Sequence, residues 1–388
     1  MHPPAPPPPS RASDRAPRQY ELDWLRLLAV VLVVLLHLAQ TYARPNDPAA
    51  VGSFQSPTLA HLIALTSYWR MPVLFCVAGM VAVHTRGRRA LGSYVRTRAE
   101  RLLLPLFLGV GVLTPVQLAL EGRLTGHVGL RFAWGYFWFL GALVAITVAT
   151  IPVGSWLARP AVQARLAPAA ERGGTLVLLA ALPFVGALLP YSWVGDAPVL
   201  GHVGLKTLLG YAGDFVAGMV LASVPGFRAT VMRRRAAALL VWAVAAAVQA
   251  TGVRVGLEPH LPVLAEAVAG WAWVLACFGF ATRYLSRPSR TIVRWAPRAL
   301  AIYALHGVPL AAARTLVLPP ALPLGVEVTL LVALTVFGAL ALVRGAEGFG
   351  GTARVFGLRY DSLPEPRVVA ARLAATLRRA TRMVAGTA

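Results

Sequence analysis

The stretch that decides the fold class is LDWLRLLAVVLVVLLHLAQ, residues 22–40. It is apolar without the alternation of a strand, and with its flanks it covers about 20 residues, the length that an α-helix needs to cross a hydrocarbon core of about 30 Å. Because lipid offers the backbone no hydrogen-bond partners, such a segment must be helical. Its Asp23, Arg26 and His37 are costly in this setting, and ionisable groups inside a membrane mark candidate functional sites.

Comparable apolar stretches recur along the chain of 388 residues, of which 57% are hydrophobic and 13% are charged. Soluble domains carry roughly 25% charged residues, so this composition excludes an ordinary soluble protein. We therefore predict an all-α polytopic membrane protein with ten transmembrane helices. Their expected positions are residues 22–42, 66–84, 101–120, 134–157, 174–192, 207–224, 236–253, 261–281, 297–316 and 324–343.

The basic residues predict how these helices are oriented. Thirty of the 37 Lys and Arg residues lie in the amino-terminal segment, in alternate loops and after residue 343. Cytosolic loops carry an excess of positive charge, so both termini are predicted to be cytosolic. Arg greatly outnumbers Lys and Ala is abundant, a bias that we attribute to a GC-rich bacterial genome, so we expect the inner (plasma) membrane of a bacterium. This orientation in the lipid bilayer accounts for the net charge of +22, and a nucleic-acid partner is not expected. The six basic residues assigned to outer loops are Arg44, Arg123, Arg131, Lys206, Arg254 and Arg314.

Both ends of the chain differ from the predicted membrane domain, residues 20–345. Residues 1–19 are rich in Pro and Arg and lack the apolar residues of a core, so we expect a disordered cytosolic tail. Residues 346–388 are expected to form a second cytosolic tail. Within it Val369, Leu373 and Leu377 recur at i, i+4 spacing among arginines, which predicts a basic amphipathic helix on the membrane surface.

The three ionisable residues of the first helix share one face. Asp23 and Arg26 are three residues apart and can pair, and His37 follows Arg26 after about three turns. A rise of 1.5 Å per residue puts His37 about 16 Å beyond Arg26, past the middle of the membrane. Spacing alone is equally compatible with an Arg26 that only marks the membrane boundary and a His37 that only packs between helices.

The same stretch resembles the first helix of the acyltransferase family 3 integral membrane acyltransferases, in which an Arg near the start is followed some three turns later by a His. The resemblance continues in order through YWRMPVLFCVAGM (68–80), RTRAERLLLPLF (96–107), TPVQLALEG (114–122), YFWFLGAL (136–143) and RALAIYALHGVPL (298–310). The resemblance implies transfer of an acyl group, commonly acetyl, from acyl-CoA to a hydroxyl of a glycan, lipid or secondary metabolite.

Arg98 and Arg101 are the candidate donor-binding residues. They match the Arg-x-x-Arg pattern of the family and share one face at the predicted cytosolic start of the third helix. The guanidinium fork binds phosphate oxygens bidentately, which suits the phosphates of an acyl-CoA co-substrate, with acetyl-CoA expected first. The alternative is that this cluster serves only as a positive-inside signal.

His37, His306 and Arg26 are the candidate catalytic residues. An imidazole with a pKa near 6.5 can accept a hydroxyl proton, so His37 suits the general base. His306 is a second imidazole at mid-depth, in the ninth predicted helix, and Tyr303 lies one turn before it. A buried histidine that only packs is the competing interpretation for both.

Four further residues are predicted to bind the acceptor. Arg70 lies near the extracytosolic end of a helix, where the positive-inside rule does not favour a cation, so we expect it to face a polar cavity and to pair with a carboxylate such as Glu121. Trp138 can line the acceptor entrance. Tyr136 stands where the family pattern has a His, so the role of that position is open in this chain.

A non-enzymatic transporter or exporter is the alternative function, because ten helices with polar residues around a cavity also describe one. Two sequence features count against a transporter. The two halves of the chain show no internal repeat, and no pair of helices broken by Gly or Pro occurs at matching positions in the two halves. We expect no permanently bound cofactor and no metal, because the eight histidines lack metal-ligand spacing.

The orientation of the helices can be tested with reporter fusions. Fusions after Arg89, Arg172, Arg235 and Arg290 should report the cytosol, because positive loops are retained there. Fusions near Asp47, Arg123, Asp196 and Arg254 should report the outside. A consistent inversion beyond some residue would show that a helix has been miscounted at that point.

Overall fold

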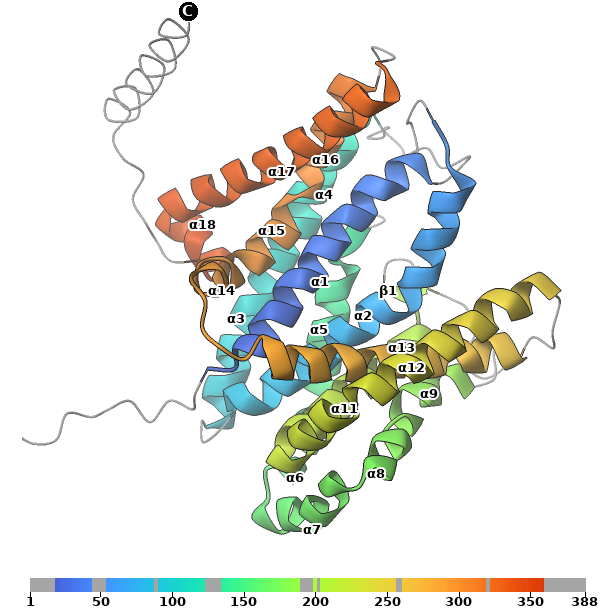
Figure 1. The fold of residues 1–388 in the computed structure, drawn as a ribbon. Helices are drawn as coiled ribbons and strands as arrows, with labels where there is room; N and C mark the ends of the chain where they lie inside the picture. Colours follow the sequence, from blue (N-terminus) through green and yellow to red (C-terminus); the bar gives the residue numbers. More distant parts are fainter. Residues whose placement is uncertain are drawn as a thin grey trace, which may run out of the picture.

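The computed structural model describes residues 18–43, 54–86, 90–122, 134–188, 198–200, 203–255, 260–318 and 322–358. These residues are almost entirely helical and include one short antiparallel pair, β1 (Pro198–Leu200) with β2 (Val203–Gly204) (Figure 1). The all-α class is therefore confirmed. Most of the predicted amino-terminal tail and the predicted amphipathic helix after residue 365 lie outside the described residues.

The described residues form a succession of helices. In order they are α1 (Tyr20–Ala39), η1 (Gln40–Tyr42), α2 (Pro57–Arg86), α3 (Leu91–Leu108), η2 (Gly109–Leu113), α4 (Thr114–Leu120), η3 (Gly135–Phe137), α5 (Trp138–Ala149), α6 (Ile151–Leu157), α7 (Pro160–Glu171), α8 (Gly173–Leu178), α9 (Ala181–Leu188), α11 (Leu205–Ser223), α12 (Pro225–Val255), α13 (His260–Tyr284), α14 (Arg290–Trp295), η4 (Ala296–Arg298), α15 (Ala299–Leu305), α16 (Gly307–Val317), α17 (Leu324–Gly348) and α18 (Gly350–Val355).

Five helical segments in the described part of the chain are long and apolar enough to cross a membrane: Tyr20–Tyr42, Leu91–Leu120, Leu205–Ser223, Leu264–Tyr284 and Leu324–Gly348. Two pairs, each bent by 53°, raise the number to seven: Gly135–Ala149 with Ile151–Leu157, and Arg290–Leu305 with Gly307–Val317. The chain is therefore a polytopic membrane protein with five to seven candidate spans. The other three predicted segments are also helical, in α2, in α8 with α9, and in α12, but they do not meet this criterion, so the count of ten stays a prediction.

Glycines allow α2 and α11 to pack backbone against backbone. A Cβ atom on Gly79 of α2 would lie 1.9 Å from the carbonyl oxygen of Phe215, and one on Gly218 of α11 would lie 2.0 Å from that of Cys76. Small residues permit this close approach in membranes, where van der Waals contact drives helix association. The two helices therefore form one rigid unit that also carries Arg70.

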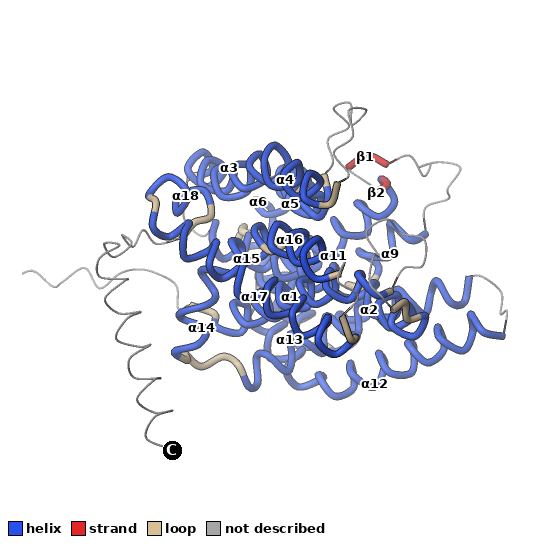
Figure 2. The backbone as a smooth tube through the Cα atoms, turned by 90° about the horizontal axis from the view of Figure 1, so that it is seen from above, coloured by secondary structure: helices blue, strands red, loops and turns tan. Residues whose placement is uncertain are grey.

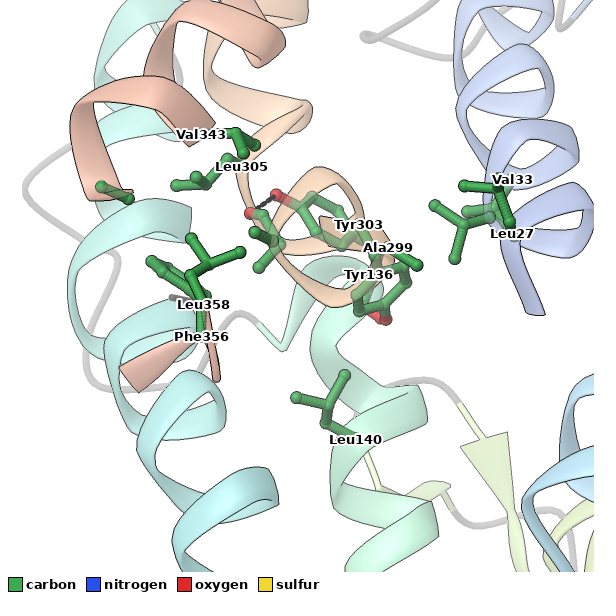
Figure 3. Close-up of a cluster of buried hydrophobic side chains, with 14 of the residues drawn as sticks. Leu27, Val33, Tyr136, Leu140, Ala299, Tyr303, Leu305, Val343, Phe356 and Leu358 are labelled. Carbon is green, nitrogen blue, oxygen red and sulfur yellow. Dashed lines mark hydrogen bonds between the residues drawn. The ribbon is translucent and has the colours of Figure 1, made fainter. Parts of the chain in front are cut away.

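One face of helix α1 packs against α2, α13 and α15, whereas Leu28, Val31 and Leu35 of the same helix are 43–50% exposed (Figure 2). A buried apolar cluster joins α1 to α2, α3, α5, α15, α17 and the segment after α18; its members include Leu27, Val33, Tyr136, Leu140, Ala299, Tyr303, Leu305, Val343, Phe356 and Leu358 (Figure 3). Phe356 and Leu358 follow α18, which contacts α3 and α17. Residues 346–358, which the sequence places in the carboxyl-terminal tail, thus pack with the helical bundle.

A π-helical turn, η2, continues α3 towards α4 and makes room for an aromatic side chain. A Cβ atom on Gly109 would lie 2.2 Å from Cε1 of Phe137, and Phe137 is completely buried. Such turns concentrate at functional sites because they reshape a helix locally. Here the glycine lets Phe137 insert beside η2, and the adjacent Tyr136 is held in the core.

The close packing of α2 and α11 predicts a large effect from one methyl group. Gly218→Ala should lower the free energy of unfolding by about 1–3 kcal/mol or more, because the new Cβ meets a backbone oxygen that cannot rotate away. Gly345→Ala in α17 is the matched control, since nothing lies within 4 Å of its Cβ position. The control should be neutral or stabilising by up to about 1 kcal/mol. Thermal unfolding in detergent measures both, and equal midpoints would contradict the close contact.

Candidate active site

The structure brings His37 and His306 together. His37 lies near the end of α1, and His306 lies at the bend between α15 and α16. Their ring centroids are 5.3 Å apart, and His306 is completely buried. Two residues that the sequence selected separately as catalytic candidates therefore form one pair, called here the histidine pair.

His306 presents a free nitrogen because its backbone surroundings determine which nitrogen is protonated. Its Nδ1 lies 2.7 Å from the carbonyl oxygen of Tyr303, so Nδ1 donates the hydrogen bond and carries the proton. Within the described part of the chain, Nε2 is buried and has no hydrogen-bond partner. A neutral imidazole in this tautomer offers a lone pair on Nε2 that can accept a proton or a hydrogen bond from a hydroxyl group.

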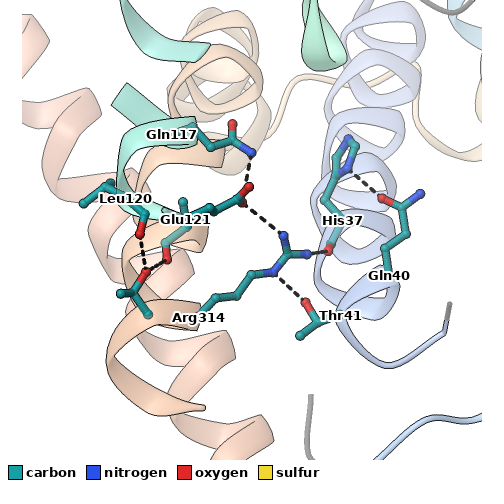
Figure 4. A network of polar contacts seen from close by, with 9 residues as sticks. His37, Gln40, Thr41, Gln117, Leu120, Glu121 and Arg314 are labelled. Atoms are coloured by element: carbon teal, nitrogen blue, oxygen red, sulfur yellow. Dashed lines mark hydrogen bonds and ion pairs between the residues drawn. The ribbon is translucent and has the colours of Figure 1, made fainter. Parts of the chain in front are cut away.

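His37 is oriented by a residue on its own helix. Its Nδ1 lies 3.1 Å from Oε1 of Gln40, so Nδ1 donates and Nε2 is again the nitrogen with the lone pair (Figure 4). Gln40 follows His37 by three residues, a spacing at which side chains on a helix meet. The sequence analysis did not select Gln40, although this spacing was available to it.

Tyr136 borders both histidines. Its ring centroid lies 4.7 Å from that of His306 and 5.6 Å from that of His37. Its hydroxyl donates to the carbonyl oxygen of Ala304 at 2.9 Å, and a Cβ atom on Gly307 would lie only 2.5 Å from that hydroxyl. Tyr136 therefore closes one side of the pair and uses its hydroxyl to attach η3 to α15.

A buried arginine fixes the end of α1 that carries His37. Arg314 of α16 has 8% of its side chain exposed; its Nη2 donates to the His37 carbonyl at 3.0 Å and its Nε to Oγ1 of Thr41 at 2.9 Å. Its Nη1 lies 3.4 Å from Oε1 of Glu121, which also accepts from Gln117 at 3.4 Å (Figure 4). The sequence analysis placed Arg314 in an outer loop, and this assignment is wrong because the residue is buried inside α16. The carboxylate suggested as a partner for Arg70 is thus the ion-pair partner of Arg314.

Arg70 lies near His37 of the histidine pair and near a group of aromatic rings. Its charge acts on His37 and also on Tyr211 of α11. The Tyr211 ring stacks on Phe75, with centroids 4.6 Å apart, and on Trp138, with centroids 5.9 Å apart. Trp138, predicted to bind the acceptor, thus stacks on Tyr211, which was not among the residues predicted from the sequence. Arg70, another predicted acceptor residue, lies close enough for its charge to act on the same tyrosine.

Arg26 lies with the donor-binding candidates rather than with His37. It pairs with Asp23 at 3.9 Å, as the i, i+3 spacing predicts, and Asp23 also binds Arg18 at 2.6 Å. The charges of Arg26, Arg98 and Arg101 act on one another, so these three residues form one group, called here the arginine cluster. Within the described residues, Nε of Arg98 is buried without a hydrogen-bond partner. An anion would satisfy that donor.

A cavity of about 230 Å³ opens beside the same part of α3. Tyr94, one turn before Arg98, lines it together with Arg86 and Thr147. Thr147 Oγ1 is buried without a hydrogen-bond partner in the described structure, whereas Arg86 donates to Ser155 at 2.6 Å. The cavity thus combines apolar walls with polar groups, one of which has no hydrogen-bond partner, as ligand sites do.

Comparison with known proteins identifies the family of this chain. The model of the acyltransferase family 3, described as an acyltransferase domain, matches residues 19–344 and so covers α1 to nearly the end of α17. No curated protein and no solved structure matches the chain. The matched region contains the histidine pair, the arginine cluster and Arg70. This chain belongs to the acyltransferase family 3, and it is a multi-pass membrane acyltransferase.

Proposed function

We propose that the protein moves an acyl group, with acetyl expected first, from a cytosolic acyl-CoA to a hydroxyl of a glycan, lipid or secondary metabolite. The observation that carries this proposal is the histidine pair, in which both rings have their lone pair on Nε2. An imidazole base within reach of an acceptor hydroxyl is what O-acylation requires, because a neutral hydroxyl is a weak nucleophile.

In the proposed reaction, Nε2 of His37 removes the proton of the acceptor hydroxyl as its oxygen attacks the thioester carbonyl. The carbon–sulfur bond then breaks, the new oxygen ester forms, and the thiolate of coenzyme A leaves and takes the proton from His37. His306 stays neutral during this cycle, because two imidazolium rings with centroids 5.3 Å apart would repel each other. We assign the base to His37 because Gln40 orients its ring and Arg314 holds its backbone.

For the donor, we propose that Arg98 and Arg101 bind the phosphates of acyl-CoA, with Arg26 as a third cation. The free Nε of Arg98 supports this assignment, since three clustered guanidinium groups repel one another unless an anion lies between them. The nearby cavity of about 230 Å³ is suited to a less charged part of the same molecule. For the acceptor, we propose the side of the histidine pair that carries Arg70, Tyr211 and Trp138.

Replacing His37 tests the proposed base. His37→Ala should lower turnover by about 10²–10⁴-fold, the usual contribution of a general base, while acyl-CoA binding stays unchanged. The wild-type rate should fall on the acid side of its pH profile, where the imidazole becomes protonated, and this limb should be missing from the variant. Acyl transfer by purified protein, measured as coenzyme A release across a pH series, provides both readouts.

Two histidine variants act as controls for this experiment. His61→Ala removes an exposed imidazole of α2 and should leave turnover unchanged. His306→Ala separates the two members of the pair: if it abolished turnover while His37→Ala retained most of it, the roles would be reversed. If His37→Ala transferred acyl groups at nearly the wild-type rate, His37 would serve only in packing, and the proposed mechanism would be refuted.

The donor site can be tested by removing its charges. Arg98→Gln and Arg101→Gln should each weaken acetyl-CoA binding by roughly 10–150-fold, because each loses a charged hydrogen bond of about 1.5–3 kcal/mol. Arg96→Gln is the matched control on the same helix, since Arg96 is 81% exposed and pairs with Glu100. Calorimetry on folded protein gives the affinities. If a variant with both substitutions bound acetyl-CoA with unchanged affinity, the two arginines would serve only to orient the protein in the membrane.

A further inference from the structure

A second, larger cavity lies away from the histidine pair and the arginine cluster. It occupies about 640 Å³ between α8, α9, α12 and α13, in the part of the molecule where Figure 1 shows α8 and α9 beside the α12–α13 pair. Its lining is apolar, with Val177, Phe184, Ala238 and Trp271 among its members, and Arg234 is the one charged residue in it. The Trp271 indole nitrogen already donates to the Leu176 carbonyl at 2.9 Å, so Trp271 has no hydrogen bond left to offer a ligand.

The dimensions of this cavity match one leaflet of a membrane. Its lining on α12 runs from Val231 to Val241, which is about 15 Å of helix and half of a hydrocarbon core of about 30 Å. Val177 and Val241 on its rim are 72% and 47% exposed, so the cavity is open at the outer surface of the helices. This exposed apolar rim suits the entry of a ligand from the bilayer.

The end of the cavity at Arg234 is positively charged. Arg234 packs over Gly173, where a Cβ atom would lie 3.2 Å from its Nε. In the described part of the chain Arg234 has no hydrogen bond or ion pair, whereas its neighbours are engaged: Arg233 donates to Thr230 at 2.9 Å and Arg235 to the Met232 carbonyl at 2.6 Å. Arg234 is thus the arginine of this group that is available to an anion.

We propose that this cavity binds an anionic phospholipid, with an acyl chain between α9, α12 and α13 and with its phosphate at Arg234. An apolar chain fits the lining, and a phosphate supplies the acceptor oxygens that Arg234 lacks. Among membrane components, an anionic phospholipid combines these two features in one leaflet. The bound lipid would fill the space that separates α8 and α9 from the α12–α13 pair, and it shares no residue with the proposed acyl-transfer site.

Native mass spectrometry of the full-length protein tests this proposal. After delipidation in detergent, the protein is titrated with phosphatidylglycerol or with phosphatidylcholine, and the fraction carrying one lipid is measured. The wild type should bind phosphatidylglycerol at least about tenfold more tightly than phosphatidylcholine. Arg234→Gln should reduce that preference by about tenfold or more, because it removes the charged contact. Arg233→Gln is the matched control and should keep the preference.

A variant that fills the cavity separates this site from general attraction between lipid and basic residues. Ala238→Trp should abolish tight binding of phosphatidylglycerol while Arg234 remains in place. Equal losses in Arg233→Gln and Arg234→Gln, or no preference for phosphatidylglycerol in the wild type, would overturn the proposal. Arg234 is exposed, so Arg234→Gln is expected to fold. It tests the lipid site even if Ala238→Trp fails to fold. Acyl transfer is measured in parallel and should not follow lipid binding, because the two sites are separate.

Discussion

The arrangement of the candidate active site depends on the buried ion pair between Arg314 and Glu121. The two side chains are 8% and 9% exposed, and Arg314 also binds the backbone of His37 and the hydroxyl of Thr41. It thereby ties the end of α1 to α4 and α16, the helix that begins directly after His306. Breaking a buried pair leaves an uncompensated charge and costs about 3–5 kcal/mol, so this contact strongly favours one position of α1. The ion pair thereby helps to hold His37 beside His306.

Helix α1 links two chemically different regions. Its first turns carry Arg26 in the arginine cluster, and its last turns carry His37 in the histidine pair. The two residues are about 16 Å apart by helical rise, which is about half of the hydrocarbon core. In the proposed function, an elongated donor such as acyl-CoA suits this separation, with its phosphates at the arginines and its thioester at the histidines. The separation of Arg26 and His37 along α1 therefore has a direct role in that proposal.

Glycine residues, which have no side chain, shape this site as much as its polar residues do. Gly307 leaves space for the Tyr136 hydroxyl, Gly109 for the Phe137 ring, and Gly79 for the backbone of α11. In lipid, where burial of apolar surface does not drive helices together, close contact and internal hydrogen bonds must do so. Tyr136 is an example, because it makes both kinds of contact. Its hydroxyl binds the backbone of α15, and its ring lies against both members of the histidine pair.

The sequence by itself determined the helical membrane class, the positions of the helical segments and the pairing of Asp23 with Arg26. These features depend on local quantities, namely apolar length and i, i+3 spacing, which act within one helix. Only the tertiary structure decided that His37 lies beside His306, that Arg26 joins Arg98 and Arg101, and that Arg314, 277 residues after His37, is buried against its carbonyl. Contacts between residues far apart in the chain determine which helices are neighbours. A local hydropathy pattern does not contain this information, because it depends only on residues within one helix.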